Sequence, residues 1–432
     1  PFWNEWLKLC EQSVPANVEQ GFLTNLLGTG FFGPPADVGE RSFRVLASFA
    51  IAAATVPDAK RAGAPPAHAS MDALASLVVV LVRTATPGEG ATEAARAASQ
   101  LSILTQALSA ITTSIVRQHA AAAAAAQYGG GVSIFQQRAW LRLISSLFDL
   151  LDVNPALDAI QPQILLALGA CLEALRPARL PGFTFAWLEL VSNRSFMSKL
   201  LLLKGRRGWP RMQSLFIGMF RFLYPYLQMV ELAPAVRAIY GGVLRVLLVL
   251  LHDFPEFLCD NHLTFCDSIP KTCIQLRNLV LSAFPRSMRL PDPFMPSLKV
   301  DRLAEVAQPP RLLSQYTVEL QQTNLLGELD RFLRTRQPHG FAGDLARGQL
   351  AAAGGGVPSA SLLSALAMHA GAHAIAALAV KAAGGQQLAS TDFGETAGME
   401  ILSTLAAEFD SEARYNLLNA MAHQLRYPNP HT

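Results

Sequence analysis

Apolar residues recur along much of the chain at intervals of three and four, the period of a helix with one buried face. The clearest row has five aliphatic side chains: Leu101, Leu104, Leu108, Ile111 and Ile115. A second row mixes aliphatic and aromatic side chains and stops before a turn-forming pair: Trp140, Leu143, Ile144, Leu147, Phe148 and Leu151, before Asn154-Pro155. Both patterns predict amphipathic helices.

The same period predicts further helices, each of which ends at a proline, a glycine or a charged turn. They are Ile164–Leu175, Phe185–Leu203, Gln213–Tyr224, Val236–His252, Thr272–Phe284, Arg311–Arg334, Leu362–Ala382, Glu395–Phe409 and Ala413–Leu425. Asp392 and Glu395 have the spacing of a capping box, and Asp410 is a suitable N-cap for the last helix. Alternating runs bounded by Asn-Gly or Asp-Gly turns are absent from the sequence, so we expect almost no β-sheet.

A succession of helices with short breaks and no exact repeat favours an all-α fold of stacked antiparallel helical hairpins, a HEAT-like α-solenoid. An irregular helical bundle is the alternative. Three low-complexity segments, Pro57–Ala69, Ala120–Gly131 and Pro338–Pro358, are interpreted as flexible surface insertions.

These segments divide the chain into consecutive regions. Residues 1–120 form an N-terminal helical region, 121–131 an insertion, 132–337 the core of the domain, 338–358 a second insertion, and 359–432 the C-terminal helices.

Composition narrows the class of protein. Hydrophobic residues make up 51% of the chain, which excludes disorder as its main state, and the net charge of +3 gives no sign of a dedicated nucleic-acid or membrane-surface binder. Five cysteines in a chain of this length favour a reducing compartment over a disulfide framework. Polar or charged residues interrupt every apolar run, so we expect a soluble protein without a membrane span.

Motifs that could carry catalysis or bind cofactors are weak. Gly28–Gly33 matches the dinucleotide fingerprint, but no strand precedes it, and we interpret its glycines as the end of a helix. His252-Asp253 has no nucleophile elbow beside it and fits a helix C-terminus. We therefore expect no enzyme, no catalytic residue and no cofactor.

Three cysteines and one histidine come closest to a metal site: Cys259, His262, Cys266 and Cys273. Zinc needs four such ligands converging from separate elements. Residues 259, 262 and 266 instead fall on one face of a single helix, among apolar neighbours, so we favour a core role over a metal site.

A basic loop is the one local cluster of cations beside an aromatic residue. It contains Lys204, Arg206, Arg207, Trp209 and Arg211. Such a loop could contact RNA phosphates while Trp209 stacks on a base. We favour a solvated turn with Trp209 packed inward, and keep an RNA-contacting helical repeat as the alternative function.

Aromatic residues beside prolines gather in three segments, Leu180–Leu188, His252–Leu258 and Ala283–Phe294. Repeated prolines favour extended backbone in the third. Extended apolar segments beside helices serve as core straps or as docking surfaces. The predicted partner contacts are Phe254, Phe257, Arg286, Arg289, Leu290 and Phe294.

Four segments carry a family resemblance: Leu180–Leu190, Leu244–His262, Ile274–Asp301 and Leu417–Asn429. They resemble the C-terminal domain of the Not scaffold proteins, the largest subunits of CCR/NOT mRNA deadenylase complexes. The likeness is long and specific through about Leu180–Asp301, and it extends to Phe2–Phe49.

The resemblance implies a helical, HEAT-like scaffold domain without catalysis of its own. In the family this domain docks the second and third Not subunits, which pair through their Not boxes. It thereby couples deadenylation to translational repression and mRNA decay. It also implies an indirect association with mRNA and a cytoplasmic location, including processing bodies, with the nucleus as a second location. The family domain continues beyond the segment like Leu417–Asn429, so we expect that this chain is truncated.

Overall fold

The computed structural model of the chain describes residues 2–11, 16–32, 36–55, 68–85, 90–128, 135–286, 292, 294–296, 298–299, 316–350, 358–384 and 392–422. It divides into two compact units, and the last boundary between them, after Val243, falls within a helix. The N-terminal unit contains Pro1–Tyr226 and Glu231–Val243, and the C-terminal unit contains Leu227–Val230 and Leu244–Thr432. The described residues form helices and no strand, which confirms the all-α prediction.

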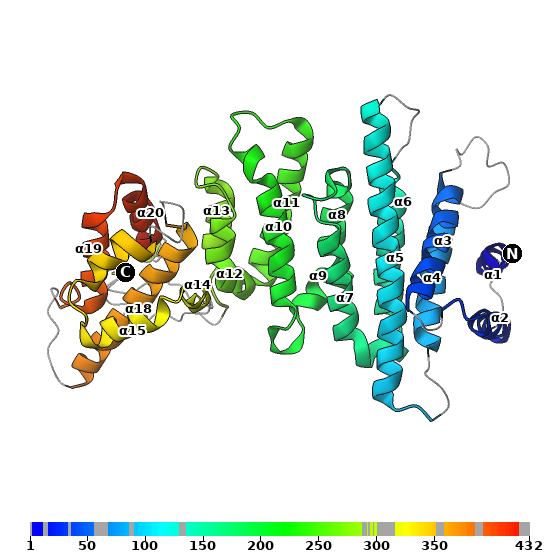
Figure 1. Ribbon diagram of the computed structural model, residues 1–432, viewed down its shortest axis with the longest axis horizontal. Coiled ribbons are helices and arrows are strands. Elements are labelled where there is room, and N and C mark those ends of the chain that lie inside the picture. The colour runs from blue at the N-terminus through cyan, green and yellow to red at the C-terminus, as the bar shows by residue number, and fades with distance from the viewer. Residues whose placement is uncertain are drawn as a thin grey trace. The chain divides into compact units, whose positions relative to one another are not determined.

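The described helices and short 3-10 segments of the N-terminal unit are drawn in Figure 1. They are α1 (Phe2–Glu11), α2 (Ala16–Gly28), α3 (Ala36–Ala54), α4 (Ala69–Thr84), α5 (Glu93–Tyr128), α6 (Gln137–Asp152), η2 (Pro155–Ile160), α7 (Gln161–Ala174), η3 (Pro181–Phe183), α8 (Thr184–Val191), α9 (Arg194–Leu201), η4 (Lys204–Arg206), α10 (Trp209–Leu227) and the first part of α11 (Pro234–Asp253).

The C-terminal unit begins with the second part of α11. Its other helices are α12 (Pro255–Asp267), α13 (Ile274–Leu281), α14 (Thr317–Gln322), α15 (Leu326–Thr335), α16 (Phe341–Asp344), η7 (Leu345–Gln349), α18 (Ala360–Ala383), α19 (Ala397–Glu408) and α20 (Ser411–Ala422).

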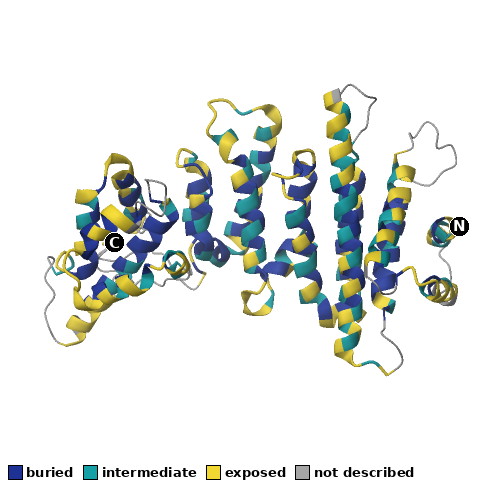
Figure 2. Ribbon diagram, viewed as in Figure 1, coloured by how far each residue is buried: buried dark blue, intermediate teal, exposed yellow. Residues whose placement is uncertain are grey.

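Two layers of helices make up the stack in the N-terminal unit. The helices α3, α5, α7 and α9 contact one another in order, and α4, α6 and α8 contact one another in the second layer. In Figure 1 the helices α3 to α8 lie lengthwise, whereas α1 and α2 are seen end-on. Buried residues follow the facing sides of the stacked helices, as Figure 2 shows. This arrangement is the predicted stack of antiparallel hairpins.

Buried tryptophans fix neighbouring helices to each other. The indole N–H of Trp6 in α1 donates to the carbonyl of Ala73 in α4 at 2.7 Å. Trp187 in α8 donates to Leu172 in α7 at 2.7 Å. Trp140 in α6 donates to the Gln118 side chain in α5 at 2.6 Å. A buried indole needs such a partner, so each bond also sets how its two helices pack.

Helix α18 lies in the core of the C-terminal unit. Residues 361–368 are all buried, so the first turns of this helix are enclosed on every side rather than along one stripe. It contacts α14, α19 and α20, which contribute much of the surrounding core. Core side chains of this unit include Leu320, Leu329, Phe332, Leu366, Ile401 and Leu417.

Three described helical stretches are long and apolar enough to cross a membrane by length and composition. They are Pro155–Ala174, Pro234–Asp253 and Ala360–Lys381. In Ala360–Lys381, 61% of the most apolar stretch is buried inside the protein. The apolar character of α18 is therefore explained by its packing in the core. That the chain has no membrane span stays a prediction.

The predicted insertion at Ala120–Gly131 is helical for most of its length. Helix α5 continues through the alanine run to Tyr128, and its last turns are largely exposed. Alanine has the highest helix propensity of the amino acids, so a run of alanines extends a helix that has already started. The interpretation of residues 120–128 as a flexible loop is therefore wrong, and Gly129–Gly131 lie outside the described residues.

The second predicted insertion, Pro338–Pro358, is also partly wrong. It contains α16 and the single π-turn η7, and Phe341, Leu345 and Leu350 are core residues. The Leu350 N–H donates to the Leu345 carbonyl, so two buried leucines five positions apart share one side. A spacing of five differs from the spacings of three and four that indicate an α-helix, so the sequence pattern did not predict this turn. Residues 351–357 lie outside the described part of the chain.

Helix ends show which local signals were reliable. Gly30 has a φ of 75° just after α2, which confirms that the glycines there end a helix. Asp410 accepts from the Ala413 N–H at 2.8 Å and confirms its predicted cap. The predicted capping box of Asp392 and Glu395 is wrong, because α19 begins later and Thr396 is its N-cap.

Two long predicted helices are each broken in two. The predicted helix Phe185–Leu203 ends its first part at Val191, and Asn193 caps α9 by accepting from the Ser195 N–H at 2.8 Å. The predicted helix Arg311–Arg334 contains a turn between α14 and α15, where Asn324 has a φ of 57°.

A glycine allows α18 and α19 to approach closely. A Cβ atom at Gly398 would overlap the carbonyl oxygen of Ala370, whereas one at Gly371 would meet nothing within 4 Å. We expect Gly398→Ala to destabilise the protein by about 1–3 kcal/mol, because backbone must move to accept it. Gly371→Ala should stabilise it by about 0.5–1 kcal/mol through helix propensity. Urea denaturation of both variants measures these changes in the free energy of unfolding. Equal changes in the two variants would contradict the close approach of α18 and α19.

Candidate protein-binding surfaces

The two predicted aromatic contacts near α12 lie in different surroundings. Phe254 is half-buried and stands just before Pro255, which begins α12. Phe257 is fully buried, with its ring edge-on to Phe265 at 5.7 Å between centroids. Its position on the core face of α12 removes it from the surface, so the prediction that Phe257 contacts a partner is wrong.

Arg286 forms hydrogen bonds with the last carbonyl groups of α11. Its guanidinium donates to the carbonyl oxygens of His252, at 3.1 Å, and Asp253. Its backbone N–H donates to the Glu256 carboxylate at 3.0 Å. The last carbonyls of a helix lack partners within the helix, and a cation there also complements the helix dipole. Arg286 thus holds the segment after α13 against the turn between α11 and α12.

Large apolar side chains on either side of Arg286 in the sequence stand in solvent. Phe294 is 90% exposed, and Met295 and Phe284 are also exposed. The Phe294 N–H is fixed by the Asp292 carboxylate at 2.9 Å, so the backbone is held while the ring is uncovered. The predicted contacts Arg289 and Leu290 lie outside the described residues. Phe294 therefore retains the exposure that a partner contact needs.

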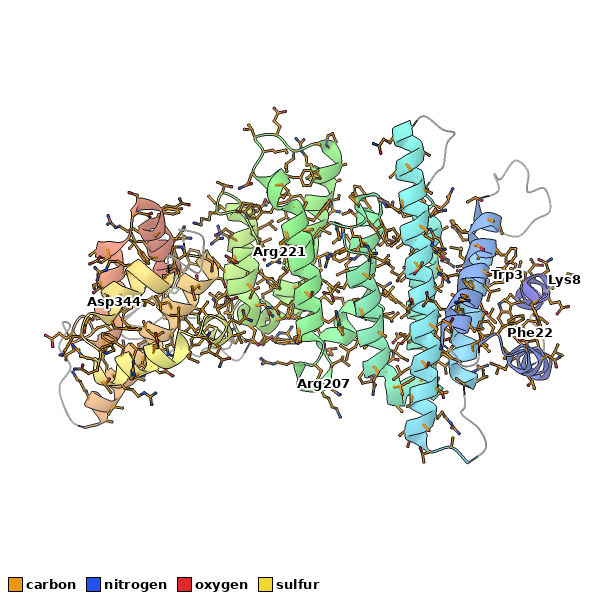
Figure 3. All side chains as sticks on the ribbon, in the orientation of Figure 1. Trp3, Lys8, Phe22, Arg207, Arg221 and Asp344 are labelled. Atoms are coloured by element: carbon orange, nitrogen blue, oxygen red, sulfur yellow. The ribbon has the colours of Figure 1, made fainter. Side chains whose placement is uncertain are left out.

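The basic loop between α9 and α10 presents three exposed cations, Lys204, Arg206 and Arg207. Two residues with positive φ form its turn, Gly205 at 68° and Arg206 at 57°. In Figure 3 the Arg207 side chain extends away from this loop.

Trp209 and Arg211, the other two residues of the predicted RNA site, serve the fold. The Trp209 indole donates to the Leu201 carbonyl at 3.0 Å, and the Arg206 guanidinium lies over its ring at 4.3 Å. Arg211 forms an ion pair with Glu173, which also accepts from Ser214 at 2.6 Å. The Trp209 face is thus covered and the Arg211 charge is paired, which disfavours the predicted base stacking and phosphate contact at these two residues.

The cysteine and histidine cluster lies in the core. Cys259, His262 and Cys266 are buried on α12, and the His262 Nδ1 lies 2.6 Å from the Cys259 carbonyl oxygen. Cys273 is half-buried and precedes α13. Among the described residues, no three potential His, Cys, Asp or Glu ligands converge as a metal site would require.

Arg277 is a buried structural residue that the sequence did not reveal. Its guanidinium donates to the carbonyls of Cys266, at 2.7 Å, and Ile269, at 3.5 Å, just where α12 ends. Its spacing within α13 resembles that of an ordinary solvated arginine. Only the approach of α12 and α13 shows that it supplies donors to the end of a neighbouring helix.

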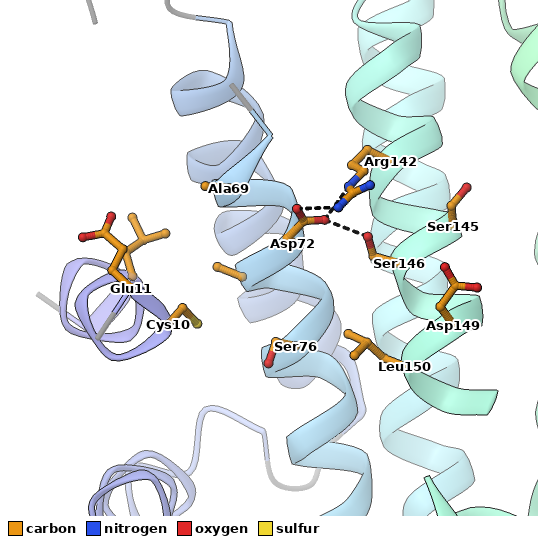
Figure 4. A pocket seen from close by; sticks show the side chains of 12 residues that line it. Cys10, Glu11, Ala69, Asp72, Ser76, Arg142, Ser145, Ser146, Asp149 and Leu150 are labelled. Atoms are coloured by element: carbon orange, nitrogen blue, oxygen red, sulfur yellow. Dashed lines mark hydrogen bonds and ion pairs between the residues drawn. The ribbon is translucent and has the colours of Figure 1, made fainter. Parts of the chain in front are cut away.

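A cavity of about 590 Å³ with both polar and apolar walls lies between α1, α4 and α6. Figure 4 shows Asp72 of α4 facing Arg142 and Ser146 of α6. Asp72 accepts two bonds from Arg142, at 2.7 and 3.0 Å, and one from Ser146 at 2.7 Å. The hydrogen bond and charge of Asp72 raise the pKa of Arg142. This bidentate pair joins α4 to α6 and links residues 70 positions apart in the sequence. A local sequence motif could not have predicted it.

Comparison with known proteins decides the family. The model for the family described as CCR4-Not complex component, Not1, matches residues 147–432. The chain belongs to the Not1 family. The CCR4-NOT transcription complex subunit let-711 of Caenorhabditis elegans is 38% identical to it over 311 residues, 69% of this chain. The general negative regulator of transcription subunit 1 of Schizosaccharomyces pombe is 31% identical over 380 residues, 85% of this chain.

These relatives are much longer than this chain. The matched part spans 12% of the worm protein and 16% of the fission-yeast protein. The resemblance to the Not scaffold proteins is confirmed, and it concerns one segment of such a protein.

Solved structures share the fold. The NOT1 superfamily homology domain from Chaetomium thermophilum matches all of this chain and 80% of its own, with a TM-score of 0.81 and 23% identity. A Not1 C-terminal domain solved in complex with Not4 matches all of this chain and 84% of its own, with a TM-score of 0.78 and 22% identity. Both likenesses support the helical architecture.

Two substitutions separate a structural residue from an exposed one. Arg286→Ala should lower the free energy of unfolding by about 1 kcal/mol, because the last carbonyls of α11 lose a charged donor and can only bond to water. Phe294→Ala should change it by less than about 0.5 kcal/mol, since most of the ring is in solvent. Urea denaturation measures both. An unchanged Arg286→Ala variant would show that these hydrogen bonds add nothing to stability.

Proposed function

We propose that this chain is a scaffold segment, without catalysis of its own, of a CCR4-NOT complex. The observation that carries the proposal is the Not1 family match over residues 147–432. A relative named as a CCR4-NOT subunit supports it. In this proposal the segment docks the heterodimer of the second and third Not subunits and so serves deadenylation, translational repression and mRNA decay. It does so in the cytoplasm, including processing bodies, and in the nucleus.

Exposed apolar side chains of the C-terminal unit suit a docking role. Phe284, Phe294 and Met295 lie within the family-matched region, and the Phe294 N–H donates to the Asp292 carboxylate. Interfaces derive most of their binding energy from a few aromatic and arginine anchors. A solved Not1 C-terminal domain holds Not4, so a domain of this fold accommodates another protein. We therefore assign Phe294 as an anchor for the partner.

The chemistry of candidate catalytic groups also fits a scaffold. His252 and Asp253 form an exposed pair at the end of α11, with 2.8 Å between Nδ1 and the carboxylate. Their adjacent carbonyls accept from Arg286, which is the role of a helix end. Burial raises the pKa of the Cys171 thiol to about 11, so this cysteine stays protonated and is a poor nucleophile at neutral pH.

The docking proposal is tested by mixing the chain with a preformed heterodimer of the second and third Not subunits. We expect a 1:1:1 complex by light scattering during size-exclusion chromatography. Phe294→Glu should weaken binding about tenfold or more, because a charge replaces an apolar anchor. Leu202→Glu is the matched control, since Leu202 is 71% exposed in the other unit. Failure of a folded chain to bind would refute the docking, and equal loss in both variants would refute the role of Phe294.

Direct RNA binding would need the exposed cations of the basic loop. If these cations bind phosphates, the double substitution Lys204→Gln and Arg207→Gln should lower the affinity for RNA. It should also make the slope of log affinity against log salt concentration shallower, by about the amount expected for two lost phosphate contacts. Because Trp209 is covered and Arg211 is paired, we expect only weak binding that these substitutions barely change. Fluorescence anisotropy with a single-stranded RNA at several salt concentrations distinguishes the outcomes. Tight, strongly salt-dependent binding lost in the double variant would favour the RNA function.

A further inference from the structure

A second cavity, of about 520 Å³, lies in the N-terminal unit, outside the family-matched region. Residues of α1, α2, α3 and the turn after α2 line it, with Leu77 of α4. Its walls are mostly apolar and rich in aromatic residues, which include Phe2, Trp3, Trp6, Phe22, Phe31 and Phe49. A volume of this size with apolar walls is typical of a binding site.

The inner wall is held in place before any ligand binds. Trp3 and Trp6 are buried, and the Trp6 indole is fixed by its bond to Ala73 of α4. Phe22 stacks on Trp6 at 5.6 Å and meets Phe2 edge-on at 6.1 Å. Figure 3 shows Trp3 on α1 and Phe22 on α2, the two helices seen end-on. Rigid walls reduce the ordering that a ligand must bring about.

The outer rim is a row of residues along α3 at intervals of four. Arg41, Val45 and Phe49 all line the cavity, and Val45 and Phe49 remain 53% and 54% exposed. Residues four apart form the ridge that packs into the groove of a second helix. The shape of this rim therefore suits a helix rather than an extended chain.

The charge of the residues that line the cavity indicates which charge a ligand should carry. Among the described residues that line the cavity, Arg41 is the one charged residue, and none is a carboxylate. Its guanidinium bonds to Asp37 one turn earlier at 2.9 Å, and both side chains are exposed. A ligand carboxylate could share or replace that contact with little rearrangement. A ligand cation would find no opposite charge within the lining.

We propose that this aromatic cavity binds an amphipathic helix of another protein, with leucine or phenylalanine anchors inside and an Asp or Glu one turn away, facing Arg41. The helix would lie along the Arg41–Val45–Phe49 row and insert its anchors between α1, α2 and α3. This surface is distinct from the docking surface around Phe294, which lies in the other unit.

The probe is a synthetic helical peptide of about sixteen residues, near four turns, with leucine and phenylalanine on one face and a glutamate one turn before the first anchor. A matched peptide carries lysine at that position. By fluorescence anisotropy, the glutamate peptide should bind about tenfold or more tightly than the lysine peptide. Val45→Glu and Phe49→Glu should each weaken it by a similar factor, and circular dichroism confirms that both variants fold.

Charge reversal supplies the decisive variant. Arg41→Glu should reverse the preference, so that the lysine peptide becomes the tighter ligand, a result that loss of structure cannot produce. Val153→Glu is the matched control, because Val153 is 73% exposed in the same unit and does not line the cavity. No binding of either peptide up to about 1 mM, equal binding of both, or unchanged binding by Phe49→Glu would overturn the proposal.

Failure of this proposal is separable from failure of the scaffold proposal. The peptide assay depends on residues 2–49 and uses no Not subunit, whereas the complex assay depends on Phe294. Loss of one activity with retention of the other identifies which surface has been misassigned.

Discussion

Burial of an apolar helix face against the next helix in the same layer is the interaction on which this structure depends. Most of its helices are too short to be stable alone in water, so they persist because they pack. In the N-terminal unit each layer is built by contacts between every second helix, as from α3 to α5 and from α4 to α6. Buried indoles add directional bonds to this packing, and those of Trp140 and Trp187 tie helices of opposite layers together.

Three side chains that can donate hydrogen bonds bond to the ends of these helices. Arg277 and Arg286 supply donors to the last carbonyls of α12 and α11, and the Trp209 indole does the same at the end of α9. Stacked helices expose many such ends, and an unpaired buried carbonyl is costly. Arginine and tryptophan residues that could contact a partner therefore already form hydrogen bonds within the fold. Exposed apolar side chains are the better indicators of an interface.

Two surfaces meet that description in different units. Phe294 stands in solvent beside a fixed backbone within the family-matched region, and the aromatic cavity beside α3 lies before that region. The first fits the proposed docking of Not subunits. The second has a single cation and a helical ridge, which favour an acidic amphipathic helix. A scaffold with separate surfaces of different chemistry can hold different partners at the same time.

The sequence by itself determined the helical class, most helix positions and the family, because apolar spacing and turn residues act over a few neighbours. It also located Asp410 as a cap and the exposed Phe294. Tertiary structure decided which of the candidate residues face solvent. Phe257 and Phe294 look alike in sequence, yet one fills the core of its unit and the other does not. The Asp72–Arg142 pair and the aromatic cavity likewise join distant segments, and such contacts exist only once helices have packed.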